Sequence, residues 1–383
     1  MPRDARRTLL YLAVALVLSM STWFSASAVL PQLRADWGLG DTAAAWLTIA
    51  VQLGFVAGAL ASSLFNLADV VAARHVIVVG SAGAAAANLG LVAVSGAAGA
   101  IPLRFLTGFF LAGVYPPALK LIATWFVRGR GVALGVLVGA LTVGSAAPHL
   151  VNGLGGLDPH VVVVVTSALT AAGGAVVLAA VREGPFPFPR ATFDPRQAGR
   201  ALRNRGVRLA SLGYFGHMWE LYAMWAWFLV FARETLYDNG TAALATFAVI
   251  AVGGLGCVAG GLAGDRLGRA ETTIACMAVS GLCAVAIGLV PNWLALSVAL
   301  VWGFAVVADS AQFSTLVTEH ADQAYVGTAL TLQLAIGFTL TVATIWLLPY
   351  LEAGVGWRYA FAFLALGPAL GIVAMLRLRA AAA

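Results

Sequence analysis

The chain has 383 residues, of which 61% are hydrophobic and 10% charged, and its formal net charge is +6. About a quarter of the residues of a soluble domain are charged, so a water-soluble fold of this composition would carry too few charges to stay dissolved. The apolar segments do not alternate with polar residues, which favours membrane-spanning helices over a β-barrel. The basic residues lie in short connections between these segments, and we therefore expect no nucleic-acid partner.

Twelve apolar segments follow one another along the chain. Each can cross about 30 Å of hydrocarbon as a helix that rises about 1.5 Å per residue. The first is too long for the apolar core of a signal peptide and is expected to remain as a span. The sequence therefore predicts an all-α membrane protein embedded in a lipid bilayer. The expected spans are 9–30, 42–64, 75–95, 98–122, 131–153, 159–181, 208–232, 241–264, 272–291, 293–315, 326–349 and 356–376.

The positions of lysine and arginine test this assignment. If the N-terminus is cytoplasmic, seventeen of the 22 lysine and arginine residues lie in cytoplasmic connections or termini. Three (Arg34, Arg233 and Arg358) lie in outer connections. The remaining two, Arg104 and Lys120, lie within a predicted span. Because basic residues concentrate on the cytoplasmic side, we expect a multi-pass protein of the cell (inner or plasma) membrane with both termini cytoplasmic.

The longest connection divides the chain into two groups of six spans. It is rich in proline at first and then basic, with a short helix expected from about residue 195. The sequence GFVAGALA at 54–61 matches GCVAGGLA at 256–263 at six of eight positions, which indicates an internal duplication. We therefore predict an N-terminal six-helix bundle at 1–181, a cytoplasmic linker at 182–207 and a pseudo-symmetric C-terminal six-helix bundle at 208–383.

The second copy of this repeat leads into a loop of glycines and charges between the eighth and ninth spans. The glycines permit a tight turn, and the charges can tie neighbouring helix ends together. The pattern resembles the G-x-x-x-D-R-x-G-R loop of the major facilitator superfamily, and the resemblance implies a conformational latch. The first half has Ser63 at the position of the aspartate. The expected latch residues are Gly261, Asp265, Arg266, Gly268 and Arg269.

Two further patterns extend the resemblance. In the fourth span, Arg104, Gly108 and Gly113 resemble the family's R-x-x-x-G-x-x-x-x-G pattern. In the fifth span, glycines repeat every four residues from Gly131, and such stripes let helices pack closely. The family implies a transporter that works by alternating access. The layout is loosely similar to the cyanate and nitrate permease branches, although the glycine-rich nitrate signature is absent.

Titratable residues inside spans are costly and mark candidate functional positions. Glu220 lies near the middle of the seventh span, and His217 lies one turn before it. Asp309 lies in the tenth span, where the first half has a valine. These three residues are the candidates for proton coupling, with Glu220 the first choice; a structural ion pair is the alternative.

Basic, aromatic and amide side chains within the spans are candidates for contact with a solute. Arg104 and Lys120 are the cationic ones; bonding of Arg104 to carbonyls and snorkelling of Lys120 are the structural alternatives. Pro116 and Pro117 are expected to bend the helix between them. The full set is Arg104, Lys120, Trp23, Gln52, Tyr115, Trp225, Gln312 and Gln333.

Secondary active transport of a small solute is the function that these features favour. No GxxxxGK[ST] motif is present, so an ion gradient, with protons as a candidate, is the expected energy source. Two buried cations favour a small organic or inorganic anion, whereas two acids and an aromatic seventh span favour a cationic or amphipathic drug as the substrate of an efflux pump. A non-transporting receptor and a membrane enzyme are the other classes considered. We expect a monomer without catalytic residues, cofactor or metal, in which the three cysteines are core residues.

Overall fold

A computed structural model describes residues 3–65, 67–126, 130–155, 158–186, 193–322 and 324–382. The described residues form helices and no strands, as the sequence predicts. Among the described residues, ten helical segments are long and apolar enough to cross a membrane, and they correspond to ten of the twelve predicted spans.

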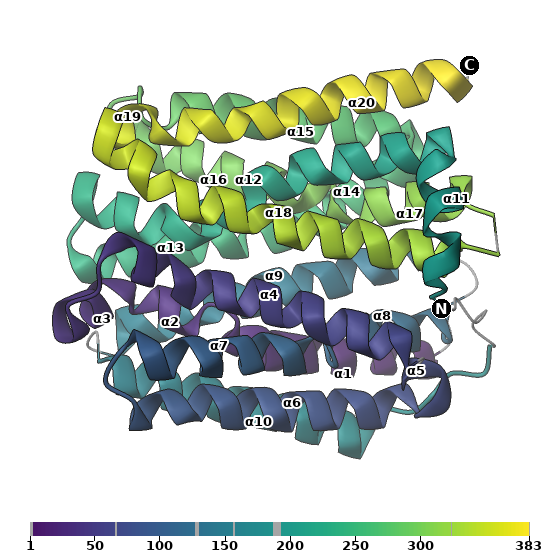
Figure 1. The fold of residues 1–383 in the computed structure, drawn as a ribbon, viewed down its shortest axis with the longest axis horizontal. Helices are drawn as coiled ribbons and strands as arrows, with labels where there is room; N and C mark the ends of the chain where they lie inside the picture. Colours follow the sequence, from purple (N-terminus) through teal and green to yellow (C-terminus); the bar gives the residue numbers. More distant parts are fainter. Residues whose placement is uncertain are drawn as a thin grey trace.

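The first part of the chain forms helices that lie side by side in the lower half of Figure 1. Several expected spans consist of two or more helical pieces. The elements are α1 (Arg3–Ser19), η1 (Met20–Thr22), α2 (Ser25–Ala28), α3 (Leu30–Trp37), α4 (Asp41–Leu64), α5 (Leu67–Val70), α6 (Ala73–Leu89), η2 (Gly90–Ala93), α7 (Ala97–Leu111), α8 (Tyr115–Ala123), α9 (Arg130–Leu154) and α10 (Pro159–Ala180).

The second part forms the upper half of Figure 1, and a short helix crosses the end of the molecule between the two parts. The elements are η3 (Pro195–Gln197), α11 (Ala198–Arg203), α12 (Arg205–Thr235), α13 (Asn239–Ala251), α14 (Gly253–Leu267), α15 (Arg269–Ala286), α16 (Asn292–Ala308), α17 (Ser310–His320), α18 (Val326–Val355), α19 (Trp357–Ala360), η4 (Phe361–Ala365) and α20 (Leu366–Ala382).

Two predicted spans are not among the ten, for different reasons. The segment 9–30 is broken between Ser19 and Leu30, so no single helix in it has the required length. The segment 208–232 lies in α12, a continuous helix of 31 residues whose histidine, glutamate, tyrosine and tryptophan side chains lower its hydropathy. The fourth span is interrupted just before the two prolines at which a bend is expected, because α7 ends at Leu111 and α8 starts at Tyr115.

The two parts of the chain meet mainly along three pairs of helices: α9 packs against α13 and against α14, and α4 packs against α18. The glycines of α9 make the contact with α14 close. A Cβ added to Gly139 would lie 2.8 Å from the carbonyl oxygen of Gly254, and one added to Gly135 would lie 3.0 Å from that of Cys257. Only glycine leaves room for this approach, which confirms close packing at the predicted stripe.

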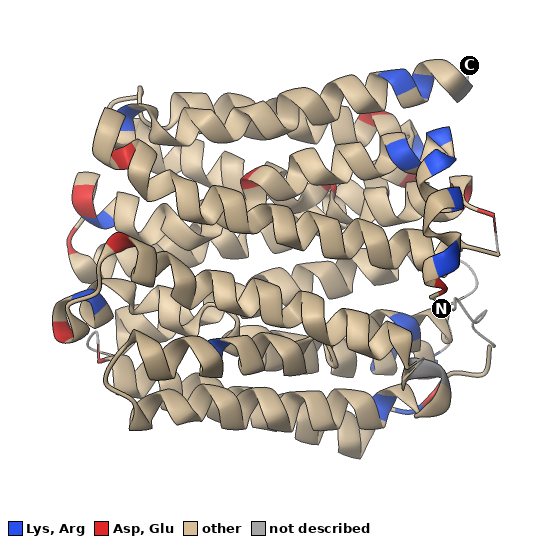
Figure 2. Ribbon diagram, viewed as in Figure 1, with Lys and Arg blue, Asp and Glu red and all other residues tan. Residues whose placement is uncertain are grey.

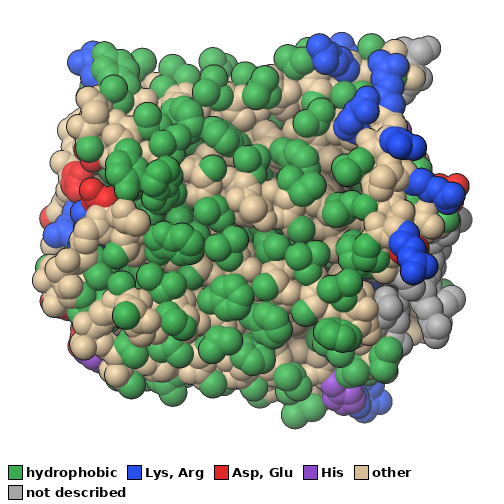
Figure 3. Space-filling view, viewed as in Figure 1, with side chains coloured by type: hydrophobic (Ala, Val, Ile, Leu, Met, Phe, Trp, Pro, Cys, Tyr) green, Lys and Arg blue, Asp and Glu red, His purple; other side chains and the backbone are tan. Residues whose placement is uncertain are grey.

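Charge is distributed unequally between the two ends of the molecule. Both ends of the described chain lie at the right of Figure 1. Basic residues gather at this end in Figure 2, whereas acidic and basic residues mix at the opposite end. Apolar side chains cover the flank between the ends (Figure 3), as expected for a surface in contact with lipid.

Candidate functional site

A buried cluster of aromatic side chains lies where the two parts of the chain meet. The Trp23 ring is 5.9 Å from that of Tyr222 and 4.9 Å from that of Phe55, and Phe338 lies 4.8 Å from Phe55. These residues come from the break in the first span, from α4, from α12 and from α18, and Trp225 packs on Tyr222 at 5.5 Å. The predicted residues Trp23 and Trp225 are thus brought into one cluster that draws on both parts of the chain.

Arg104 of α7 binds the irregular segment that follows η1. Its guanidinium is fully buried and donates hydrogen bonds to the carbonyl oxygens of Thr22 at 2.9 Å, of Trp23 and of Leu47. It also donates to Ser25 Oγ and Asn88 Oδ1, at 3.0 and 3.2 Å.

A break in a helix leaves backbone carbonyl groups without hydrogen-bond donors, and Arg104 supplies the donors here. The geometry matches the structural role considered for Arg104, and its predicted contact with solute stays a prediction.

His217 and Asp309 form a pair inside the protein. Nδ1 of His217 lies 2.9 Å from Oδ1 of Asp309, and each side chain is 1% exposed. The atoms are close enough for an ion pair when the histidine is protonated, and neither carboxylate oxygen of Asp309 accepts a hydrogen bond from the described residues. Asp309 lies at the break between α16 and α17, and Tyr214 and Phe313 flank the imidazole.

Glu220 lies one turn from His217 on α12 but has other partners. Trp302 Nε1 donates a 2.7 Å hydrogen bond to one carboxylate oxygen, and the Ser280 hydroxyl donates a 2.8 Å bond to the other. The three candidate proton-coupling residues therefore occupy two environments. Asp309 has unused acceptors, whereas each oxygen of Glu220 accepts a hydrogen bond.

Several of the residues predicted to contact a solute have buried polar side-chain atoms that make no hydrogen bond to the described residues. These atoms are both side-chain polar atoms of Gln52 and the nitrogens Trp23 Nε1, Trp225 Nε1 and Gln333 Nε2. Because buried polar groups are usually hydrogen-bonded, such a set suits water or a bound molecule. Gln312 differs: its amide donates to the Gly260 carbonyl at 3.2 Å and accepts from Arg269 at 3.0 Å. Tyr115 and Lys120 lie half-buried on α8.

His149 is a further buried polar residue, and it is not among the candidates predicted from the sequence. His149 of α9 is fully buried, and neither ring nitrogen has a hydrogen-bond partner in the part of the chain that the structure describes. The signal in the sequence is a histidine inside an apolar span. No group of three or more metal-ligating side chains occurs among the described residues.

The predicted latch lies at the end that carries the termini. Gly268 has φ +102° between α14 and α15, a conformation that favours glycine. A Cβ added to Gly131, in the first turn of α9, would lie 3.2 Å from both carboxylate oxygens of Asp265. Arg269 binds Glu319 at 2.7 Å. Gly261 is buried near Gly131, and Arg266 is exposed. In the first half, Ser63 stands at the position of the latch aspartate, and its Oγ lies 3.3 Å from Thr331 Oγ1.

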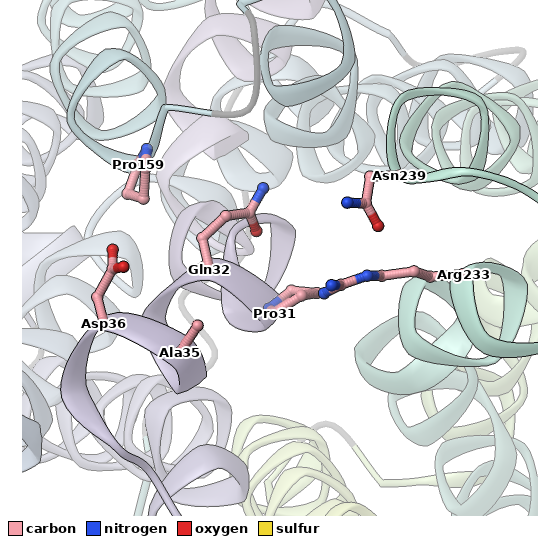
Figure 4. A pocket seen from close by; sticks show the side chains of 7 residues that line it. All are labelled: Pro31, Gln32, Ala35, Asp36, Pro159, Arg233 and Asn239. Carbon is pink, nitrogen blue, oxygen red and sulfur yellow. The ribbon is translucent and has the colours of Figure 1, made fainter.

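The opposite end has a pocket of about 380 Å³ between α3, α10, α12 and α13. Figure 4 shows Gln32, Arg233 and Asn239 around it, with Asp36 farther along α3. Gln32 donates to Asn152 Oδ1 at 3.3 Å, and Asn152 donates to the Ala28 carbonyl at 2.6 Å, so polar groups extend inward from the mouth. Beside it, hydrogen bonds from Thr241 lower the pKa of Asp238, because they stabilise its ionised form.

Comparison with known proteins gives one family. Residues 12–343 match the family model described as Major Facilitator Superfamily. A stretch of 131 residues, 32% of this chain, is 36% identical to the puromycin resistance protein pur8 of Streptomyces alboniger and spans 24% of that protein. Among solved structures, the fold is similar to that of the human organic anion transporter MFSD10 (TETRAN), with a TM-score of 0.74 and 13% identity over 98% of this chain and 100% of that chain. At 13% identity, this similarity concerns the fold alone.

Proposed function

Because the chain belongs to the major facilitator superfamily, we propose that it is a secondary transporter that exchanges a cationic, aromatic solute for protons. The observation that carries this proposal is the Asp309 carboxylate, which is buried, lies 2.9 Å from His217 Nδ1 and makes no hydrogen bond to the described residues. A cation with aromatic groups would pair with this carboxylate, in place of or beside His217, and stack on the rings of the aromatic cluster.

The charge distribution favours a cationic solute over the small anion that the sequence alone favours. An anion was expected from Arg104 and Lys120, but the Arg104 donors bind carbonyl groups of the first and second spans. The partial match to a puromycin resistance protein supports the same choice. The name of the structural relative, an organic anion transporter, carries no weight at its low identity.

The proposed architecture is twelve transmembrane helices in two six-helix bundles, 1–181 and 208–383, joined by the linker 182–207. The two parts of the chain that meet at α4–α18 and α9–α14 support this division. The end that carries the termini is proposed to be cytoplasmic, because basic residues gather there.

We propose that transport works by alternating access, and the difference between the two ends supports this proposal. At the end proposed to be cytoplasmic, α9 packs closely on α14 and Asp265 lies against the start of α9, whereas the end proposed to be outer has the 380 Å³ pocket. We assign this arrangement to an outward-facing, nearly occluded state. The glycine loop with Asp265 would then hold the cytoplasmic side shut until the solute or a proton shifts the balance.

Binding of puromycin tests the choice of substrate. Puromycin has an amine and aromatic rings, N-acetylpuromycin lacks the amine charge, and benzoate is a small organic anion. Purified protein should bind puromycin at least about tenfold more tightly than N-acetylpuromycin, a difference of about 1.4 kcal/mol that one cation contact can supply. Tryptophan fluorescence quenching measures the affinities.

Two tryptophan variants locate the site. Trp225→Leu should weaken puromycin binding about tenfold through loss of ring contact, whereas Trp293→Leu, whose side chain is 80% exposed, should not. Equal affinity for the two puromycin compounds, or tighter binding of benzoate, would contradict the cationic substrate.

Asp265→Ala tests the latch. The carboxylate lies partly exposed at the start of α9 in the other part of the chain, where an acid is worth about 0.3–1 kcal/mol through the helix dipole. The variant should slow transport by about fivefold or less and leave substrate affinity within about twofold, because the loop lies outside the aromatic cluster. Asp4→Ala, at the same end, is the control. A loss of affinity with normal turnover would contradict the latch.

A further inference from the structure

One corner of the molecule gathers six exposed arginines at the end that carries the termini. Figure 2 shows basic residues of α11, the start of α12 and the end of α20 together at the upper right. We name this set the arginine corner: Arg200, Arg203, Arg205, Arg208, Arg377 and Arg379.

The packing of α12 against α20 brings the arginines of α11 and α12 close to those of α20. The helices run antiparallel: a Cβ added to Gly216 would lie 3.0 Å from Gly371, and one added to Gly213 would lie 2.7 Å from Met375. Continuing this register toward the start of α12 sets Arg208 level with the arginines of α20. Residues separated by more than 160 positions in the sequence therefore share one surface.

Acidic residues also lie at this end of the molecule in Figure 2, but among the described residues they do not pair with the arginines of the corner. None of the six arginines forms an ion pair with the described residues, and the only side-chain hydrogen bond is from Arg200 to Gln197 at 3.3 Å. By contrast, Arg34 pairs with Asp41 at the other end of the molecule. Like charges gathered in this way repel one another unless an anion lies between them.

Exposed apolar side chains adjoin the corner on the same two helices. Leu212 of α12 is 46% exposed, and Leu370, Val373 and Leu376 of α20 are 71%, 45% and 40% exposed. Figure 3 shows apolar side chains on the flank beside the basic edge. A free phosphate would use only the arginines, whereas a phospholipid would use both the arginines and this apolar strip.

We propose that the arginine corner binds the headgroup of an anionic phospholipid, with the acyl chains along the strip of α12 and α20. Clusters of four to eight basic residues beside a membrane span attract anionic lipid, at about 1 kcal/mol for each residue near the surface. The proposal requires only that the chain spans a membrane and is independent of the transported solute.

The test uses purified full-length protein in a neutral detergent and follows thermal unfolding. Phosphatidylglycerol should raise the midpoint temperature, and phosphatidylcholine and glycerol phosphate should not, since a ligand of the folded state stabilises it. The triple variant Arg208→Gln, Arg377→Gln, Arg379→Gln should lose at least about half of the gain, because it removes half of the charges of the corner.

The matched control is Arg3→Gln, Arg6→Gln, Arg7→Gln, which removes the same charge at the same end of the molecule, on α1. It should keep the full gain with phosphatidylglycerol. An equal loss in both triple variants, or the same gain with glycerol phosphate alone, would overturn the proposal. If the triple variant of the corner does not fold, the test uses the unmodified protein. Its rise in midpoint temperature with phosphatidylglycerol should become smaller as NaCl increases from about 50 to 500 mM, because salt screens the charges. A rise that stays constant would overturn the proposal.

Discussion

Replacing Arg104 with leucine should abolish transport and lower the free energy of unfolding by at least about 3 kcal/mol, since buried acceptors would lose their donors at about 1–3 kcal/mol each. The guanidinium makes five hydrogen bonds, three of them to backbone carbonyls at the break in the first span and on α4. Thermal unfolding in detergent and uptake by vesicles measure the two effects.

Arg104→Lys separates a structural role from contact with solute. A lysine offers three donors and no planar fork, so it should recover only part of the stability. Arg34→Leu is the control, because its pair with Asp41 is partly exposed and worth about 0–1 kcal/mol. If Arg104→Lys were as stable as the unmodified protein and had only lost substrate affinity, Arg104 would be a solute contact rather than a support of the first span.

Asp309→Asn should abolish accumulation driven by a pH gradient, with a reduction of at least about 100-fold. Coupling needs a group that holds either a proton or the cationic solute, and the carboxylate beside His217 has unused acceptors for both. The aspartate-to-asparagine change removes the charge and keeps the size. Vesicles loaded with substrate, with and without a pH gradient, measure the effect.

Glu220→Gln is the matched variant, and we expect it to accumulate substrate within about twofold of the unmodified protein. A glutamine can accept from Trp302 through its oxygen and donate to the Ser280 hydroxyl through its nitrogen, so both contacts of Glu220 have a replacement. If Glu220→Gln lost the gradient response and Asp309→Asn kept it, Glu220 would be the coupling residue, as the sequence alone suggested.

Features that depend on local composition were accessible from the sequence. Apolar segments long enough to cross a bilayer located the ten described helical segments that have the length and composition of a span, because a lipid environment requires such segments whatever their neighbours. The interruption of the helix before Pro116 and the turn at Gly268 also depend on local sequence. Proline lacks a backbone N–H donor, and glycine alone readily adopts a positive φ. The helix near residue 195 of the linker was also expected and is found.

Which side chains meet was decided by the tertiary structure. Arg104 and the Thr22 carbonyl are 82 positions apart, as are Trp302 and Glu220, and no local pattern states that they are partners. The sequence paired His217 with Glu220 because they lie one turn apart, but the fold brings Asp309 to the imidazole instead. The break in the first span is stable because a guanidinium from another helix binds its free carbonyls, and that bond exists only once the helices have packed.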